Sequence, residues 1–234
     1  RDGMMVAELL PLAPFIVLGA LSGLDVVAFP QAMLSRPIVA ATAAGALAGN
    51  PLGGLTIGVA LEFFALEAMP FGSSRYPEWG SAAVIGGVLF GRVEVGTAGA
   101  MTVAVLIALI AAGIGGTSMH LLRRLNAAVA RRQQARIARG SGSAVTVVQL
   151  IGLTIDLIRA GLVTALILAI AIPLYDRALA SFVLTPVISR AVVVGTASAV
   201  GLAAIWKVTQ STAGALWYLV SGLLVGFGIA WRVA

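Results

Sequence analysis

Two carboxylates lie inside an apolar stretch of this 234-residue chain. Glu62 and Glu67 fall within residues 55–71, which are otherwise almost wholly apolar and directly follow the turn-forming residues 49–54. A carboxylate at membrane depth is costly and needs a polar cavity or a partner, and carriers place their solute sites where helices are interrupted. The combination of buried acids and a backbone break therefore predicts a solute site and indicates a transporter.

The two acids are not expected to form a catalytic pair. They are five residues apart, which on a helix of about 3.6 residues per turn is a rotation of about 140°, so their side chains point in different directions. Glu62 lies deeper in the apolar stretch and is the better candidate for lining a cavity. Glu67 is expected either to pair with Arg75 or to meet the following loop.

Other charged residues also interrupt apolar runs. Asp25 precedes Pro30, which breaks a helix and frees backbone groups, so we expect Asp25 to serve a site or a gate; the alternative is a helix-end contact with water. Arg36 either contributes to the site or anchors its helix at the membrane interface. Asp156 and Arg159 are three residues apart on one helix face, which predicts a structural ion pair.

Composition sets the class of protein that must position these residues. Hydrophobic residues make up 60% of the chain and charged residues 10%, and the mean hydropathy is +1.05. Because about 20 apolar residues span the hydrocarbon core of a bilayer, we predict an all-α polytopic membrane protein. Its candidate spans are Leu9–Phe29, Pro37–Ala48, Leu55–Phe71, Ser81–Leu89, Gly96–Ile114, Val145–Pro173, Phe182–Trp206 and Thr212–Trp231. Several are too short to cross alone, which predicts re-entrant hairpins or broken helices.

Much of the positive charge lies in one segment. Six arginines crowd residues 121–143, and no acidic residue occurs between Glu94 and Asp156. Short loops rich in Lys and Arg stay in the cytoplasm, so this basic loop is predicted to be cytoplasmic and to separate an N-terminal membrane bundle (1–120) from a C-terminal one (144–234). A contact with anionic membrane lipid or with an acidic cytosolic partner is the alternative role. The segment lacks base-stacking aromatic residues, so nucleic-acid binding is not expected.

A weak internal similarity crosses this divide. Residues 35–43 and 189–197 share Ser, Arg, Val, Thr and Ala at the same offsets. Transporters are often built from duplicated halves, so the match fits a two-half repeat. Chance similarity in an Ala- and Val-rich chain is the other explanation.

Signatures of catalysis are missing from the sequence. There is no Gly-x-x-x-x-Gly-Lys-Ser/Thr nucleotide loop, and with zero Cys and a single His there is no thiolate or His-based metal cluster. The single histidine, His120, borders the basic segment, where a solvated side chain is favoured over a proton relay or phosphate acceptor. We expect no catalytic residue, metal site or cofactor. Transport must then draw on an ion gradient, another subunit or modification of the cargo.

Three segments resemble a known family. Residues 35–49, 54–66 and 69–80 are similar to the signature region of the IIC membrane subunit of the mannose/fructose/sorbose family of the bacterial sugar phosphotransferase system. The resemblance implies helical spans with re-entrant hairpins in the bacterial inner membrane, and a hexose or related sugar as substrate. It also implies a hetero-oligomer, in which a IID membrane subunit completes the translocator and cytosolic IIA and IIB proteins relay phosphate to the sugar.

The same resemblance suggests sugar-binding residues. Asp25, Arg36 and Glu62 match polar positions of the family's signatures. Asn50 stands where members commonly show Asp, and Ser35 where some show His, which leaves the identity of the sugar open. A sugar site needs polar groups for hydroxyls and an aromatic surface for the ring, and the residues available to supply them are Asn50, Glu62, Ser73, Ser74 and Trp79.

Three functions stay open at this level. The first is a sugar-translocating IIC subunit whose substrate is phosphorylated by a partner IIB protein. The second is a membrane scaffold or accessory subunit that keeps the fold without transporting sugar, in which fixed salt bridges neutralise Asp25 and Glu62. The third is a carrier that moves unmodified solute on an ion gradient. A carrier needs the two acids to face a cavity, so their surroundings discriminate between these functions.

Overall fold

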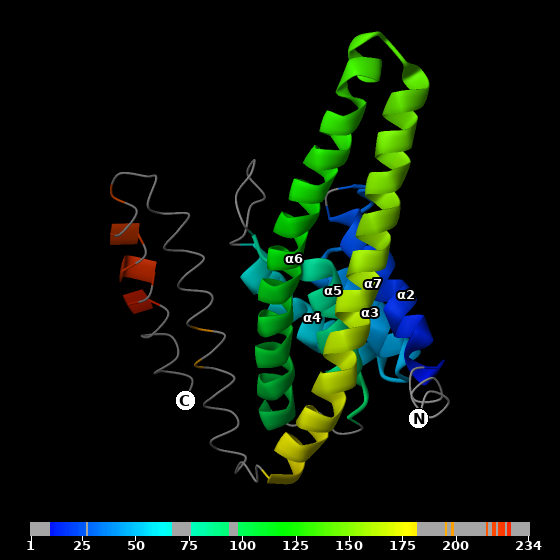
Figure 1. Ribbon diagram of the computed structural model, residues 1–234. Coiled ribbons are helices and arrows are strands. Elements are labelled where there is room, and N and C mark those ends of the chain that lie inside the picture. Colours follow the sequence, from blue (N-terminus) through cyan, green and yellow to red (C-terminus); the bar gives the residue numbers. More distant parts are fainter. Residues whose placement is uncertain are drawn as a thin grey trace.

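The described part of the chain is helical. The computed structural model describes residues 10–26, 28–66, 76–93 and 98–181 with isolated positions between 195 and 225, and no strand occurs among them. The elements are η1 (Leu10–Leu12), α2 (Ala13–Asp25), α3 (Pro37–Leu47), α4 (Pro51–Ala65), α5 (Trp79–Gly91), α6 (Ala98–Ala138) and α7 (Gly142–Ser181). Figure 1 shows α2 to α5 gathered beside the two long helices α6 and α7. The predicted all-α architecture is confirmed.

Helix α5 forms the centre of the bundle. All residues from Gly80 to Gly91 are buried, and α5 packs against α2, α3, α4, α6 and α7. A helix that is apolar all round is expected in such a position. A Cβ added at Gly87 would lie 2.5 Å from the carbonyl oxygen of Ala41 in α3, so the absent side chain lets these two backbones approach closely.

Helices α3 and α4 form a tight antiparallel hairpin, and each begins with a proline that suits the first helical position. Between them Gly49 has a φ of +92°, a left-handed conformation that glycine adopts without strain. The Asn50 N–H then donates to the carbonyl of Gly45 over 2.8 Å. The backbone break predicted at residues 49–54 is therefore a short turn between two helices. With 11 and 15 residues, α3 and α4 are about 17 and 23 Å long, too short to cross the hydrocarbon core alone.

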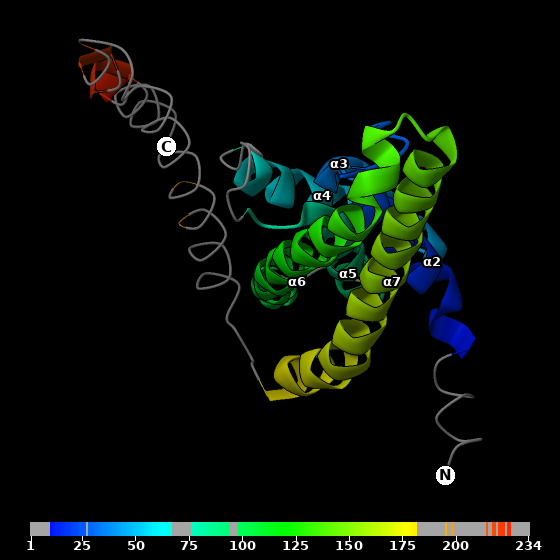
Figure 2. The ribbon, with the colours of Figure 1, turned by 45° about the horizontal axis from the view of Figure 1, so that its top comes forward.

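Helices α6 and α7 are longer than a membrane is thick. They contain 41 and 40 residues, about 60 Å each, against a hydrocarbon core of about 30 Å. By length and composition both are apolar enough to cross a membrane. Figure 1 shows them as a hairpin that projects past α2 to α5, and Figure 2 shows the same hairpin with its tip turned forward.

The basic segment is helical, which corrects the predicted loop at 121–143. Residues 121–138 continue α6, and the chain turns only at 139–141 before α7 begins at Gly142. Arg, Ala, Leu and Gln are strong helix formers, so a polar segment of this composition prolongs the helix where α7 packs alongside it. The cytoplasmic location of this segment stays a prediction.

Helix α7 packs along α2, although the two helices belong to different predicted bundles. Gly19 of α2 lies directly against Thr164, and a Cβ on Gly23 would lie 2.5 Å from the Cβ of Ala160. The division into 1–120, 121–143 and 144–234 stays a prediction.

Some sequence-based expectations fall on residues outside those described. These are the second copy of the repeat at 189–197, Glu67 and Arg75, and nearly all of the candidate spans Phe182–Trp206 and Thr212–Trp231. The two-half repeat and the re-entrant placement of the short helices stay predictions.

Candidate functional site

Asp25 ends α2 and is buried, with 2% of its surface exposed. Its carboxylate accepts hydrogen bonds from the N–H of Ala32 (2.6 Å), the N–H of Ser35 (2.9 Å) and the hydroxyl of Ser35 (3.0 Å). The loop that it holds contains two left-handed residues, Gln31 (φ +58°) and Met33 (φ +63°), a conformation that persists only where the surroundings impose it. Asp25 therefore fixes the loop between α2 and α3, and its oxygens are engaged by that loop.

Arg36 and Glu62 form an ion pair at the end of the α3–α4 hairpin opposite its turn. Glu62 also accepts a hydrogen bond from the N–H of Ile38 (3.1 Å), which lies in the first turn of α3, where backbone amides lack partners within the helix. The exposed fraction of the side chain is 48% for Arg36 and 15% for Glu62. The pair ties the start of α3 to the last turn of α4, with Arg36 on the accessible side.

Asn50 lies at the other end of this hairpin. Its side-chain oxygen accepts from the N–H of Gly53 (2.8 Å), and its amide donates to the carbonyl of Val93 (3.2 Å). It thus caps the N-terminus of α4 and joins the turn to the end of α5. Twelve residues of helix, about 18 Å, separate it from Glu62, so the structure does not bring these two predicted site residues together.

Trp79 lies at the same end of the bundle as Arg36. It starts α5, which runs parallel to α3. Its ring packs against the hydrophobic core, and its indole N–H is buried with no hydrogen-bond acceptor among the described residues. Ser73 and Ser74 lie outside the described residues. Of the predicted sugar-site residues that the structure describes, all except Asn50 therefore gather at one end of the bundle.

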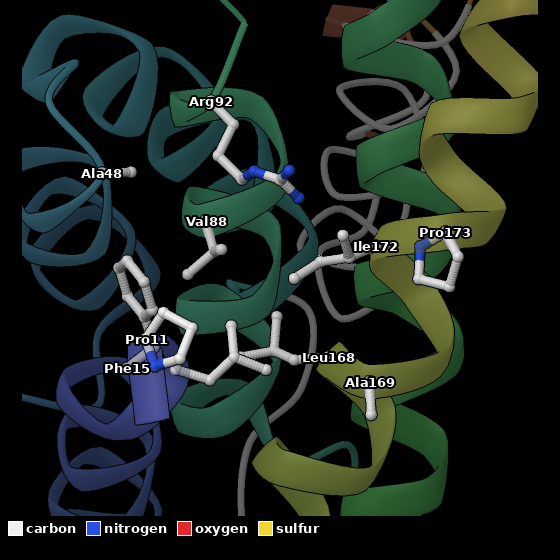
Figure 3. Close-up of a pocket in the computed structure, with 10 residues that line it drawn as sticks. Pro11, Phe15, Ala48, Val88, Arg92, Leu168, Ala169, Ile172 and Pro173 are labelled. Atoms are coloured by element: carbon white, nitrogen blue, oxygen red, sulfur yellow. The ribbon is translucent and has the colours of Figure 1, made fainter. Parts of the chain in front are cut away.

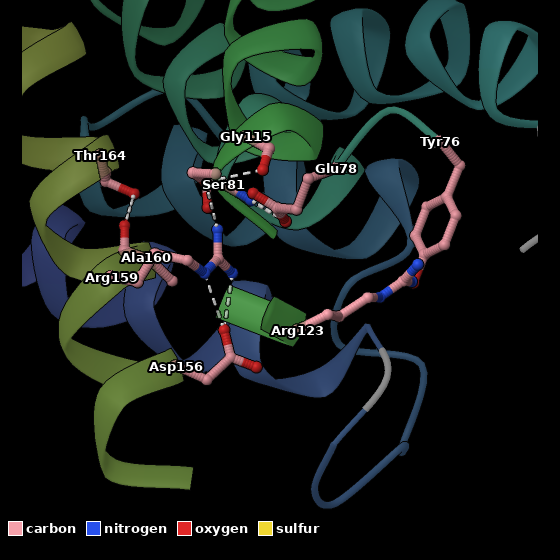
Figure 4. Close-up of polar contacts among 10 residues, drawn as sticks. Tyr76, Glu78, Ser81, Gly115, Arg123, Asp156, Arg159, Ala160 and Thr164 are labelled. Atoms are coloured by element: carbon pink, nitrogen blue, oxygen red, sulfur yellow. Dashed lines mark hydrogen bonds and ion pairs between the residues drawn. The ribbon is translucent and has the colours of Figure 1, made fainter. Parts of the chain in front are cut away.

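Glu78 is a buried acid that was not among the predicted site residues. It has no exposed surface, and one of its oxygens accepts the N–H of Ser81 (3.0 Å) and caps α5. Its other oxygen has no hydrogen-bond partner among the described residues, and neither do the buried hydroxyls of Ser22 and Ser81. A Cβ on Gly115 would lie 2.9 Å from Glu78, so α6 closes over the carboxylate (Figure 4). One feature of the sequence could have identified it. An acid three residues before a serine, at the start of an apolar run, lies where a helix N-cap is expected.

Asp156 and Arg159 contact each other in the core of the bundle. The Arg159 Nη2 atom lies 2.7 Å from Asp156 Oδ1, and its Nε donates to the same oxygen over 2.9 Å. Arg159 also donates to the hydroxyl of Ser118 on α6 (2.9 Å), as Figure 4 shows in part. Side-chain exposure is 10% for Arg159 and 4% for Asp156. The ion pair expected from their spacing is present within α7. The bond from Arg159 to Ser118 also connects α7 to α6.

One arginine of the basic segment contacts the bundle. Arg123 donates to the hydroxyl of Tyr76 over 2.5 Å, and its guanidinium carbon lies 4.8 Å from the centre of the Tyr76 ring (Figure 4). This combined hydrogen bond and cation–π contact links α6 to the segment that leads into α5.

Long apolar helices, tight glycine contacts and carboxylates held by amides and arginines are together typical of an α-helical membrane protein. The family model described as PTS system sorbose-specific IIC component matches residues 9–231. The chain belongs to this family, which makes it a membrane component of a sugar phosphotransferase system. The resemblance drawn from the sequence is confirmed.

The fold is found in solved structures, among them the following two. One, described as "Structure of membrane protein", has a TM-score of 0.70 and 18% identity, over 96% of this chain and 92% of its own. The other is a cryo-EM structure of the mannose transporter ManYZ in complex with microcin E492, with a TM-score of 0.59 and 18% identity, over 94% of this chain and 86% of its own. At this identity the likeness concerns the fold alone. No curated protein matches the sequence.

Proposed function

We propose that this chain forms the sugar pathway of a phosphotransferase-system permease in the bacterial inner membrane. In this proposal a hexose-type sugar binds near Arg36 and Glu62, and a partner IIB protein phosphorylates it on the cytoplasmic side. The observation that carries the proposal is the family match over residues 9–231. The likeness in fold to the mannose transporter ManYZ supports a sugar as the cargo.

Arg36 and Glu62 are the proposed sugar contacts. A sugar hydroxyl donates to a carboxylate and accepts from a guanidinium, so it can insert between two such groups when their contact opens. Arg36 is the group that a ligand reaches first, because about half of its side chain (48%) is exposed. Asp25 acts as a positioning residue, since it holds Ser35, the residue before Arg36. Trp79 supplies ring surface and an indole N–H that has no acceptor within the part of the chain that the structure describes.

The proposed assembly contains a IID-like membrane subunit and cytosolic IIA and IIB proteins. Helix α7 exposes large apolar side chains along its length, including Leu150, Leu162 and Ile170, as expected for a helix that faces lipid or another membrane subunit. The arginine-rich extension of α6 marks the proposed cytoplasmic side, because such segments are retained there. Phosphorylation on that side requires the IIB partner to approach this end of the molecule.

A scaffold without sugar transport is the second candidate, and one observation favours it. The Glu62 carboxylate is held by Arg36 and the Ile38 amide, and the Asp25 carboxylate by its own loop. In a scaffold these contacts are permanent, and Glu62→Gln changes stability alone. In a carrier they must exchange with the sugar.

Sugar binding separates the two candidates. The chain, copurified with its membrane partner and placed in nanodiscs, is titrated with radiolabelled mannose, fructose and sorbose. Glu62→Gln preserves the shape of the side chain and an acceptor for the Ile38 amide but removes the charge. We expect the affinity to fall about tenfold or more, which is about 1.4 kcal/mol per factor of ten. Asp176→Asn is the matched control, because it also removes a carboxylate near an arginine, Arg92 at 3.8 Å, away from the proposed site.

Unchanged affinity in Glu62→Gln, with normal folding, removes Glu62 from the site. Absence of saturable binding to the wild-type complex, for all three sugars, supports the scaffold. Formation of phosphosugar in vesicles supplied with IIA, IIB and a phosphoryl donor tests the proposed phosphorylation by IIB. Uptake of unmodified sugar that depends on an ion gradient contradicts that proposal.

A further inference from the structure

A pocket of about 590 Å³ opens between α2, α5 and α7, away from the Arg36–Glu62 pair. Its walls are mainly apolar and include Pro11, Phe15, Val88, Leu168 and Ile172 (Figure 3). Leu168 lies 26 residues, about 39 Å of helix, beyond the start of α7 at Gly142. The pocket is therefore at the end of the bundle opposite the arginine-rich tip of the α6–α7 hairpin.

Arg92 is the charged side chain among the residues that line this pocket. It follows the last residue of α5, and Figure 3 shows its guanidinium extending over the cavity toward α7. Among the described residues its ion-pair partner is Asp176, with 3.8 Å between Arg92 Nη2 and Asp176 Oδ2, which is longer than a hydrogen bond. The exposed side-chain fractions are 41% for Arg92 and 57% for Asp176. The guanidinium thus has donors to offer to a second anion.

A helix irregularity lies in the same wall. Pro173 lies inside α7 and has no N–H to donate to the carbonyl of Ala169, four residues earlier. Both residues line the pocket. A backbone group without its helix partner at membrane depth needs a hydrogen bond from protein, water or a ligand.

We propose that this pocket binds one anionic phospholipid, with an acyl chain between the apolar walls and the phosphate on Arg92. The carbonyl of Ala169 accepts a hydrogen bond from a hydroxyl of the headgroup, which favours a phosphatidylglycerol over a phosphatidylcholine. A free sugar does not suit the pocket, because a sugar needs several polar partners and these walls present mostly hydrocarbon. Arg92 follows the last residue of α5, and a basic side chain at the end of a membrane helix favours the headgroup region, where a lipid phosphate lies.

The test uses the full-length, delipidated protein in detergent. Native mass spectrometry counts bound lipid during titration with dioleoyl phosphatidylglycerol, dioleoyl phosphatidylcholine or soluble glycerol phosphate. We expect one saturable phosphatidylglycerol and weaker binding of the other two. Arg92→Gln should lower the phosphatidylglycerol affinity about tenfold, whereas Arg177→Gln, an exposed arginine on α7 outside the pocket lining, should not. Ala169→Phe should lower the binding of both phospholipids by filling the cavity mouth.

Size-exclusion profile and helical circular dichroism establish that each variant is folded. Equal binding by Arg92→Gln and Arg177→Gln overturns the assignment of the phosphate to Arg92. Glycerol phosphate binding as tightly as the intact lipid overturns the acyl-chain site and identifies a free phosphate ester as the ligand. Unchanged phospholipid binding in folded Ala169→Phe places the lipid elsewhere on the surface.

Discussion

Replacing Gly87 by Ala tests the packing that holds the bundle together. The added Cβ would lie 2.5 Å from the carbonyl oxygen of Ala41 and 2.8 Å from its Cα, both backbone atoms that no rotamer change can move away. Ordinary van der Waals contact begins at 3.4 Å, so α3 and α5 must separate by about 0.9 Å. Overpacking of this kind costs about 1–3 kcal/mol, and a rigid backbone contact belongs at the upper end. Replacing Gly by Ala within a helix regains about 1 kcal/mol, which leaves a net loss of about 2 kcal/mol.

Gly113→Ala is the matched control, because a Cβ at Gly113 has no neighbour within 4 Å and the residue is exposed on α6. The Gly113→Ala variant gains the higher helix propensity of alanine without a steric clash, so its free energy of unfolding should rise by about 1 kcal/mol. Thermal unfolding in one detergent, followed by the loss of monodisperse protein, measures both variants. Gly87→Ala should unfold about 4–8 °C below wild type and Gly113→Ala slightly above it. If Gly87→Ala is as stable as Gly113→Ala, the close approach of α3 and α5 derived from the structure is wrong.

The remaining predictions concern a helix cap, an ion pair and the orientation in the membrane. Asn50→Ala removes the acceptor of the Gly53 N–H and should destabilise the protein by about 1 kcal/mol in the same thermal assay, with a loss below about 0.3 kcal/mol arguing against a capping role. Asp156→Asn leaves the guanidinium of Arg159 buried without its counter-charge and should cost about 3–5 kcal/mol, whereas the double variant Asp156→Leu, Arg159→Met should recover most of that loss; a double variant no better than the single one contradicts this reasoning. The chain has no cysteine, so Arg131→Cys offers a unique thiol, which a membrane-impermeant maleimide should label in inside-out vesicles and leave unlabelled in intact cells; the reverse pattern overturns the predicted orientation.

Local rules anticipated several features of this molecule. Asp156 and Arg159 were expected to meet because a spacing of three residues places side chains on one helix face, a geometry that holds whatever surrounds the helix. The interruption at Gly49 and Asn50 was visible because these residues, followed by a proline, favour a turn. The basic segment was predicted as a loop because Arg-rich connections stay in the cytoplasm, a rule that concerns the side of the membrane and says nothing of helical structure, whereas arginine favours helices.

The grouping of the candidate site residues could not be read from spacing. Glu62 meets Arg36 and the Ile38 amide across 24 to 26 positions of sequence because α3 and α4 fold back on each other. The same antiparallel hairpin carries Asn50 to the opposite end of the bundle, away from the acid with which it was grouped. Glu78 was overlooked because its burial depends on α6 closing over it at Gly115.

The sequence by itself determined the membrane class, the helical content and the ion pair within α7, because composition and helical periodicity act over a few residues at a time. The family followed from segments that resemble its signature region. Only the tertiary structure decided which polar groups meet, how α5 comes to lie at the centre and where the pocket beside Arg92 opens. These features depend on contacts between helices that are distant in sequence. Such contacts are selected by the fit of whole helix surfaces, which small residues such as Gly87 permit without specifying the partner.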